Sequence, residues 1–162
     1  MAHHLVDLDR SFLEKTVNVL LVRDPAEVVV TLSRQLERPI LRDVGLETQC
    51  ELLDQLEARG QRPPVLDAKE LLLDPEGVLR ELCRRVGIPW EPAMLAWPAG
   101  PRPFDGIWAK HWYQNVWRST GFERHRPRSE PPPERLVPLI DECRPYYARL
   151  HDRALKARRN AP

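Results

Sequence analysis

The chain has 162 residues, of which 42% are hydrophobic and 30% are charged, and its formal net charge is +1 at pH 7. This length and composition are ordinary for one globular domain with its own core. The near-zero charge provides no general attraction to nucleic acid or to anionic membranes, and no apolar run approaches the roughly 20 residues that span a bilayer. We therefore expect neither nucleic acid nor a membrane as a partner.

The first predicted elements are a short helix over residues 9–15 and a strand over residues 17–22. The strand is an apolar run with one Asn, which is typical of a parallel strand covered on both faces. We expect it to be central in its sheet and more buried than any other strand. A helix over residues 25–36 follows, because Asp24 is a favourable N-cap and Pro25 a favourable first helical residue.

The middle of the chain predicts three more helices and a second strand. Apolar residues at helical spacing indicate a helix over residues 44–56, which Gly60 ends. A short apolar strand over residues 64–67 is followed by a helix over residues 68–72. Asp74 and Pro75 then begin a helix over residues 75–86 that Gly87 stops, with the apolar positions Val78, Leu79, Leu82, Cys83 and Val86 facing the core.

The composition along the chain predicts three parts. An α/β domain is predicted over residues 1–125, a charged, proline-rich linker over residues 126–133, and a C-terminal part over residues 134–162. The last part contains an amphipathic helix over residues 134–157 and a basic tail. The three cysteines are far apart and lie within helical patterns, so we expect buried free thiols, no metal site and a cytoplasmic protein.

One position carries a chemical signal. Arg23 follows the first strand directly and lies beside a helix N-terminus, where open α/β sheets bind anionic ligands. Thr31 is two helical turns further on, so that its hydroxyl can face the same space. The alternative is a plain strand–turn–helix in which Arg23 makes an ordinary surface ion pair.

The pattern Arg-Asp-Pro-x5-Thr after an apolar strand resembles the 3′-phosphate-binding segment of sulfotransferases. The resemblance implies that Arg23 and Thr31 hold the 3′-phosphate of 3′-phosphoadenosine-5′-phosphosulfate (PAPS), with Ser33 as a neighbour that could substitute. It also implies a partial three-layer α/β fold of the P-loop NTPase-like class, with a parallel sheet and a helix-rich C-terminal part.

Two further segments resemble the same family. Sulfotransferases place a catalytic His before the 3′-phosphate Arg, and His3 and His4 occupy that place here as candidate general bases. The alternative is a disordered start or a tag remnant. Residues 100–112 resemble a late loop in which a basic residue reaches the 3′-phosphate, which implies Arg102 as a third contact. The alternative is a Pro-Gly loop that leads into a short helix packed by tryptophans.

The family's 5′-phosphate loop has no counterpart here, because none of the seven glycines lies in a Gly-x4-Gly-Lys-Ser/Thr pattern. We therefore interpret Met1 as an internal Met of a longer ancestor. The first hypothesis is a sulfotransferase-like domain that binds PAPS, transfers sulfuryl to an unknown small-molecule acceptor, and is inactive as residues 1–162 alone. The second is a non-catalytic α/β interaction or structural module derived from a sulfotransferase.

Overall fold

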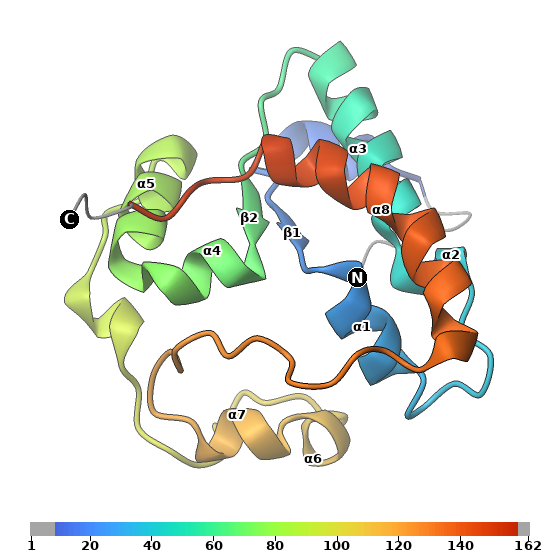
Figure 1. Ribbon diagram of the computed structural model, residues 1–162. Helices are drawn as coiled ribbons and strands as arrows, with labels where there is room; N and C mark the ends of the chain where they lie inside the picture. Colours follow the sequence, from blue (N-terminus) through green and yellow to red (C-terminus); the bar gives the residue numbers. More distant parts are fainter. Residues whose placement is uncertain (1–8, 159–162) are drawn as a thin grey trace.

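The computed structural model describes residues 9–158 and shows a mixed α/β fold that is mostly helical. Its small sheet has two parallel strands, β1 (Leu20–Val22) and β2 (Val65–Asp67). The register aligns Leu20 with Val65 and Val22 with Asp67. In Figure 1 the sheet is at the centre, with α4 and α5 on one side and α3 and α8 on the other.

The elements around the first strand follow the capping signals of the sequence. A 3-10 helix, η2 (Ser11–Lys15), precedes β1, and α1 (Pro25–Leu32) follows it. The Asp24 side chain accepts a hydrogen bond of 2.8 Å from the Ala26 N–H, which caps α1. The helix ends at Leu32, four residues before the predicted end. Its continuation is a turn, from which the Leu36 N–H still donates to the Leu32 carbonyl at 2.8 Å.

The predicted helix over residues 44–56 corresponds to α3 (Leu46–Ala58), and a separate short helix, α2 (Leu41–Val44), precedes it. Gly45 lies between them with a φ of 76°, a left-handed conformation that favours glycine and breaks the helical path. The chain then turns at Gly60, whose φ is 79°, and enters β2.

The helices after β2 agree closely with the predictions. Helix α4 (Ala68–Leu73) directly continues the strand, and α5 (Pro75–Val86) begins after Asp74, whose side chain accepts a 2.9 Å bond from the Gly77 N–H. The predicted bounds of α5 are confirmed because both of its end signals, the Asp74 cap and the left-handed Gly87, operate within one helical turn.

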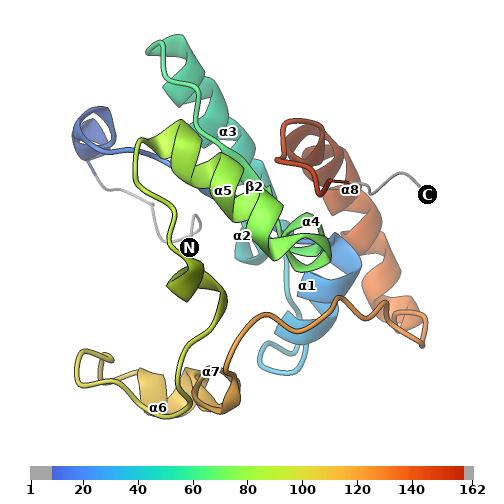
Figure 2. The same ribbon diagram turned by 90° about the vertical axis from the view of Figure 1, so that its left-hand side faces the viewer.

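A long excursion separates α5 from the last helix. It contains η3 (Pro92–Leu95), α6 (Ala109–Trp112) and α7 (Gln114–Arg118). Figures 1 and 2, which differ by a quarter turn, both place α6 and α7 away from the sheet, at the edge of the molecule. Several of the most exposed large hydrophobic side chains belong to this excursion: Phe104, Ile107, Trp108, Trp112 and Val116.

The chain returns to the core through η4 (Glu134–Leu136) and α8 (Val137–Asp152). The buried side of this segment includes Leu136, Ile140, Cys143 and Leu150, as the amphipathic pattern predicts. Helix α8 ends five residues before the predicted end. Its successor Ala154 instead forms a parallel bridge with Val65, and the Leu155 N–H donates to the Val65 carbonyl at 2.9 Å. Backbone bonding to the open edge of β2 thus replaces the last turn of the helix.

The expected burial of the first strand is wrong. Leu20 and Val22 pack into a core with residues of α3 and α8, but Leu21 on the opposite face is 59% exposed and Val19 is 40% exposed. The more buried strand is β2, whose three residues are all buried and which lies between β1 and Ala154. Side chains alternate along a strand, and within residues 9–158 only one face of β1 is covered.

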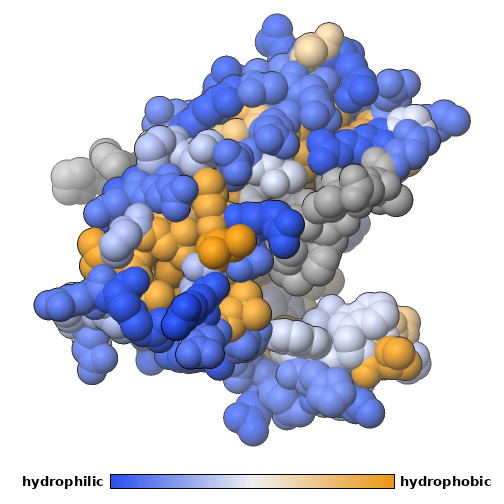
Figure 3. Space-filling view, turned by 90° about the vertical axis from the view of Figure 1, so that its right-hand side faces the viewer, coloured by the Kyte–Doolittle hydropathy of each residue, from blue (hydrophilic) through white to orange (hydrophobic). Residues whose placement is uncertain are grey.

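Hydrophobic surface is also present on the side of the molecule where α2 and the start of α8 lie. Figure 3 looks onto this side and shows a hydrophobic area bordered by hydrophilic residues. Ile40, before α2, and Val137, at the start of α8, are among the exposed large hydrophobic residues. Exposed apolar area of this kind marks surfaces that other elements can cover.

The three cysteines, Cys50, Cys83 and Cys143, are buried and free, as predicted. Burial raises the pKa of the Cys143 thiol to about 11. Within residues 9–158, no helix combines the length and the apolar character that crossing a bilayer requires.

Candidate anion-binding site

The two strands end at the same edge of the sheet, and each is followed by a helix. Val22 is aligned with Asp67, so Arg23 and Ala68 leave the sheet side by side. Helix α1 begins two residues beyond Arg23, and α4 begins at Ala68. Two helix N-termini therefore meet at the carboxyl ends of parallel strands, which is the location at which open α/β sheets bind their ligands.

At the end of β2, the side chain of Asp67 forms hydrogen bonds only within the fold. Asp67 is completely buried, and its Oδ1 accepts bonds of 3.0 Å from the backbone N–H groups of Lys69 and Glu70. Its Oδ2 accepts a 2.9 Å bond from the hydroxyl of Tyr147 on α8. Burial and the bond to Asp67 raise the pKa of Tyr147 above its ordinary value. Both oxygens of this carboxylate already accept hydrogen bonds from the protein, so Asp67 has a structural function here.

At the end of β1, the charged residue is open to solvent. The Arg23 side chain is 51% exposed, and its Nε donates to Oε2 of Glu27 at 2.6 Å. In the described part of the chain, no hydrogen bond is found for either Nη atom of Arg23. The other carboxylate oxygen of Glu27 lies 3.7 Å from Nε2 of His125. Glu27 therefore binds the Nε edge of the Arg23 guanidinium and does not bind its two Nη groups.

Glu27 and Thr31 lie on the same stripe of α1, and Arg23 comes two residues before this helix begins. Glu27 and Thr31 are four apart, and the Thr31 hydroxyl donates to the Glu27 carbonyl at 2.8 Å. Ser33 lies on a different face, because it is six residues beyond Glu27, and its hydroxyl donates to the Val30 carbonyl at 3.0 Å. Arg23 thus bonds to the carboxylate of Glu27 and Thr31 to its backbone carbonyl, whereas the Ser33 hydroxyl bonds to Val30.

Arg102 lies in the excursion that carries α6 and α7. Its guanidinium donates to the Pro98 carbonyl, and its backbone N–H donates to Oδ2 of Asp105 at 2.8 Å. Trp117 Nε1 donates to the same oxygen at 2.8 Å, and these two bonds hold the pKa of the Asp105 carboxyl below its usual range. Among residues 9–158, none of the hydrogen bonds of Arg102 reaches β1 or α1. His3 and His4 lie outside the described residues.

Three residues of this region were not anticipated as part of a site: Glu27, Asp67 and His125. Glu27 has a readable signal, since an acid four residues after an Arg predicts an ion pair on a helix. Asp67 also has one, because an Asp three residues before a Glu at the end of an apolar run is a helix-start pattern. His125 has no local signal, because its contact with Glu27 joins residues 98 positions apart in the sequence.

A family model described as a sulfotransferase domain matches residues 1–154 of the chain. Two proteins of Arabidopsis thaliana are also similar to it over 143 residues: branched-chain-amino-acid aminotransferase-like protein 2, at 32% identity, and protein 1 of the same name, at 33%. Each match covers 88% of this chain but only 25% and 26% of the two relatives, so the chain spans about a quarter of their length. No solved structure matches the chain.

Proposed function

Because the chain belongs to the sulfotransferase-domain family, we propose that it binds PAPS through the 3′-phosphate and takes part in sulfuryl transfer to a small-molecule acceptor. The observation that supports this most strongly is the position of Arg23. It follows β1 at the carboxyl edge of the sheet, its side chain is half exposed, and its two Nη groups are open to a ligand. Arginine binds phosphate through two parallel N–H bonds, so this fork suits the 3′-phosphate.

Glu27 has a defined part in this proposal. Its bond to Nε holds the guanidinium against α1, which reduces the conformational freedom that phosphate binding would otherwise have to remove. The same carboxylate repels a bound phosphate, so the affinity for PAPS depends on both the orientation of Arg23 and this repulsion. Thr31 would contribute its hydroxyl by turning from the Glu27 carbonyl toward the ligand. Ser33 and Arg102 remain proposed further contacts of the 3′-phosphate.

The transfer itself would break the bond between sulfur and the bridging oxygen of PAPS and form a bond from sulfur to an acceptor oxygen or nitrogen. The acceptor would give its proton to a general base, for which we propose His3 or His4. Charge develops on the departing phosphate, and stabilising it is the task of a phosphate loop, for which residues 1–162 have no Gly-x4-Gly-Lys-Ser/Thr pattern. We therefore expect no appreciable turnover from these residues alone.

The wider proposal follows the family. The fold would form part of a three-layer, P-loop NTPase-like α/β unit, with further strands beside β1. The three free, buried thiols support a cytoplasmic location. The names of the two plant relatives describe proteins of which this chain matches a quarter, so we do not extend an aminotransferase-like activity to it.

A second candidate is a non-catalytic interaction or structural module. Two observations favour it: Arg23 is already paired with Glu27, and the outer face of β1 exposes Val19 and Leu21. In this case Glu27 would neutralise Arg23 permanently, and the exposed face of the strand would bind another part of a larger protein.

Calorimetric titration with adenosine 3′,5′-bisphosphate separates the two candidates. We expect the wild-type chain to bind and Arg23→Ala to bind about 10–100-fold more weakly, because a hydrogen bond to a charged group contributes roughly 1.5–3 kcal/mol. Arg42→Ala is the matched control, since Arg42 is exposed on α2 and belongs to no proposed contact. Equal affinity of wild type and Arg23→Ala would remove Arg23 from the site.

Transfer of radiolabelled sulfate from PAPS to a panel of alcohols, phenols and amines tests the catalytic part. Robust turnover by the 162-residue chain would contradict the expected inactivity and would mean that other groups stabilise the departing phosphate.

A further inference from the structure

A hollow lies at the opposite end of the sheet from Arg23. It has a volume of about 480 Å³ and is bounded by the end of α3, the loop that leads into β2, the end of α5 and the end of α8. The loop residues Gly60–Pro63 come just before β2, so the hollow is at the amino ends of the strands. Its volume lies within the roughly 300–1,000 Å³ range of small-molecule sites.

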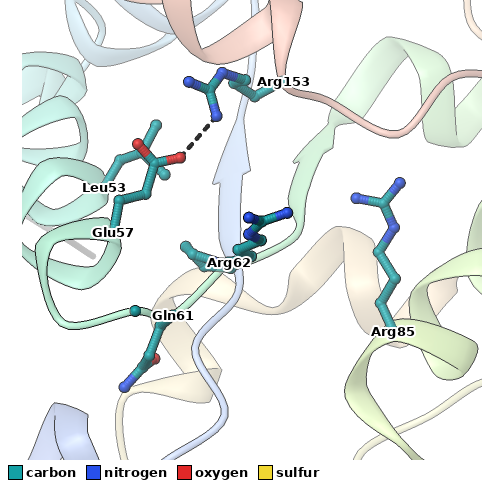
Figure 4. Close-up of a pocket in the computed structure, with 8 residues that line it drawn as sticks. Leu53, Glu57, Gln61, Arg62, Arg85 and Arg153 are labelled. Atoms are coloured by element: carbon teal, nitrogen blue, oxygen red, sulfur yellow. Dashed lines mark hydrogen bonds and ion pairs between the residues drawn. The ribbon is translucent and has the colours of Figure 1, made fainter.

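Arginines from three separate elements line this hollow. Arg62 comes from the loop before β2, Arg85 from the last turn of α5, and Arg153 from the residue that follows α8. Figure 4 shows Arg62 between the other two, with the guanidinium of Arg153 turned toward Glu57 and that of Arg85 on the α5 side. Glu57 on α3 is the one acidic residue that lines it, so the described lining carries an excess of positive charge.

The acidic residues near the hollow are already bound. Glu57 accepts a bond from Nη1 of Arg153 at 2.7 Å (Figure 4). Arg85 donates to Glu81 at 2.8 Å, but Glu81 also accepts two bonds from Arg84 and so neutralises only part of this group. Within residues 9–158, Arg62 has no acidic side chain at ion-pair distance. Arg62 is exposed to solvent, so its guanidinium is free to bind an anion that enters the hollow.

Stabilisation of helix ends accounts for two of the three arginines. Cations are favourable at helix C-termini, and Arg85 and Arg153 are at the ends of α5 and α8. Arg62 is not in a helix. The side-chain amide of the neighbouring Gln61 donates to the Leu13 carbonyl at 3.0 Å and so fixes the loop to the segment before β1. Stabilisation of a helix end therefore does not account for Arg62.

We propose that this hollow binds the oxyanion group, a phosphate or a sulfate, of a small molecule, with Arg62 as the central contact and Arg85 and Arg153 on either side. Guanidinium groups recognise such groups by paired, charge-assisted hydrogen bonds. The site is distinct from the one proposed at Arg23, at the other end of the sheet, and does not depend on it.

Calorimetric titration of the 162-residue chain with inorganic pyrophosphate, and separately with inorganic sulfate, tests this site. We expect saturable binding that Arg62→Ala weakens at least about tenfold and that Arg62→Lys, which keeps the charge but not the fork, weakens less. Arg118→Ala is the control, since Arg118 is exposed on α7 and far from the hollow in sequence. Arg23→Ala should retain the binding that Arg62→Ala loses, which separates the two sites.

Pyrophosphate binding without sulfate binding would identify a phosphorylated ligand, and the reverse a sulfated one. The proposal is overturned if neither anion binds saturably in the millimolar range, or if a folded Arg62→Ala variant binds as the wild type does. In that case Arg85 and Arg153 would only stabilise the ends of α5 and α8, and Arg85→Ala and Arg153→Ala would lower the melting temperature without a change in anion affinity.

Discussion

The β1–α1 and β2–α4 units have the same local sequence features but differ in how far the end of the strand is buried. Each is an apolar strand, an Asp that caps a helix, and the helix itself. In the second unit the strand and its Asp67 are fully buried, because Tyr147 and the segment after α8 cover them. In the first unit one face of the strand is open, and Arg23 is half exposed. What packs over a strand end, rather than the strand itself, decides whether that end is structural or available to a ligand.

The largest expected effect separates the two faces of β1. Leu20→Ala should lower the free energy of unfolding by about 2–5 kcal/mol, because Leu20 is buried against α3 and α8 and its loss leaves a cavity. Leu21→Ala should change it by less than about 0.5 kcal/mol, since Leu21 faces outward. Urea unfolding followed by circular dichroism measures both. An equal loss in the two variants would mean that the outer face of β1 is covered in solution.

The next effect compares the two helix caps. Asp67→Ala should destabilise the fold by about 2–4 kcal/mol, because it removes the cap of α4 and leaves the partly buried Tyr147 hydroxyl without its acceptor. Asp24→Ala should cost only about 1 kcal/mol, since Asp24 caps α1 with one bond and is partly exposed. The same unfolding experiment gives both values, and similar losses would show that the two caps are equivalent.

A smaller effect concerns alkaline stability. The raised pKa of Tyr147 means that the folded chain keeps this proton more tightly than the unfolded chain. The resulting stabilisation is complete below the ordinary tyrosine pKa of about 10 and is lost as the pH rises through the raised value. Tyr147→Phe should cost about 1 kcal/mol near neutral pH. It should also flatten the loss of stability above pH 10.

Unfolding at a series of alkaline pH values gives this profile. Tyr146→Phe is the control, because the Tyr146 hydroxyl bonds to Glu47 and does not contact Asp67. An alkaline profile that is the same in wild type and Tyr147→Phe would mean that another group causes the loss of stability above pH 10.

The smallest effect concerns the balance at Arg23. Glu27→Gln removes a negative charge beside the proposed phosphate position and should raise the affinity for adenosine 3′,5′-bisphosphate a few-fold, since exposed ion pairs contribute roughly 0.2–1 kcal/mol. Glu76→Gln is the matched control, because Glu76 forms a similar pair with Arg80 on α5. A weaker affinity in Glu27→Gln would show that orienting Arg23 outweighs the repulsion.

Much of the secondary structure could be predicted from residues close together in the sequence. The bounds of α5 are correct because Asp74 and Gly87 act on the nearest turn, and the start of α1 is correct for the same reason. The position of Arg23 beside the helix that carries Thr31 followed from the same signals. The family was also identified from these residues, and the match over residues 1–154 confirms it.

The structure alone decided the features that depend on residues distant in sequence. The apolar run of β1 has the same appearance whether one face or both are covered, so its burial could not be read from it. The contact of His125 with Glu27, the bond of Tyr147 to Asp67, and the convergence of Arg62, Arg85 and Arg153 on one hollow all join segments that only folding brings together.

The sequence by itself therefore determined where helices and strands begin and which charged residue follows the first strand. Capping, helical periodicity and glycine conformations act over a few residues, and their energies hardly depend on the rest of the chain. Only the tertiary structure decided which strand is buried and which charges remain open to a ligand. Burial and charge compensation depend on the elements that pack over a site, and here these come from α8 and the segments around it.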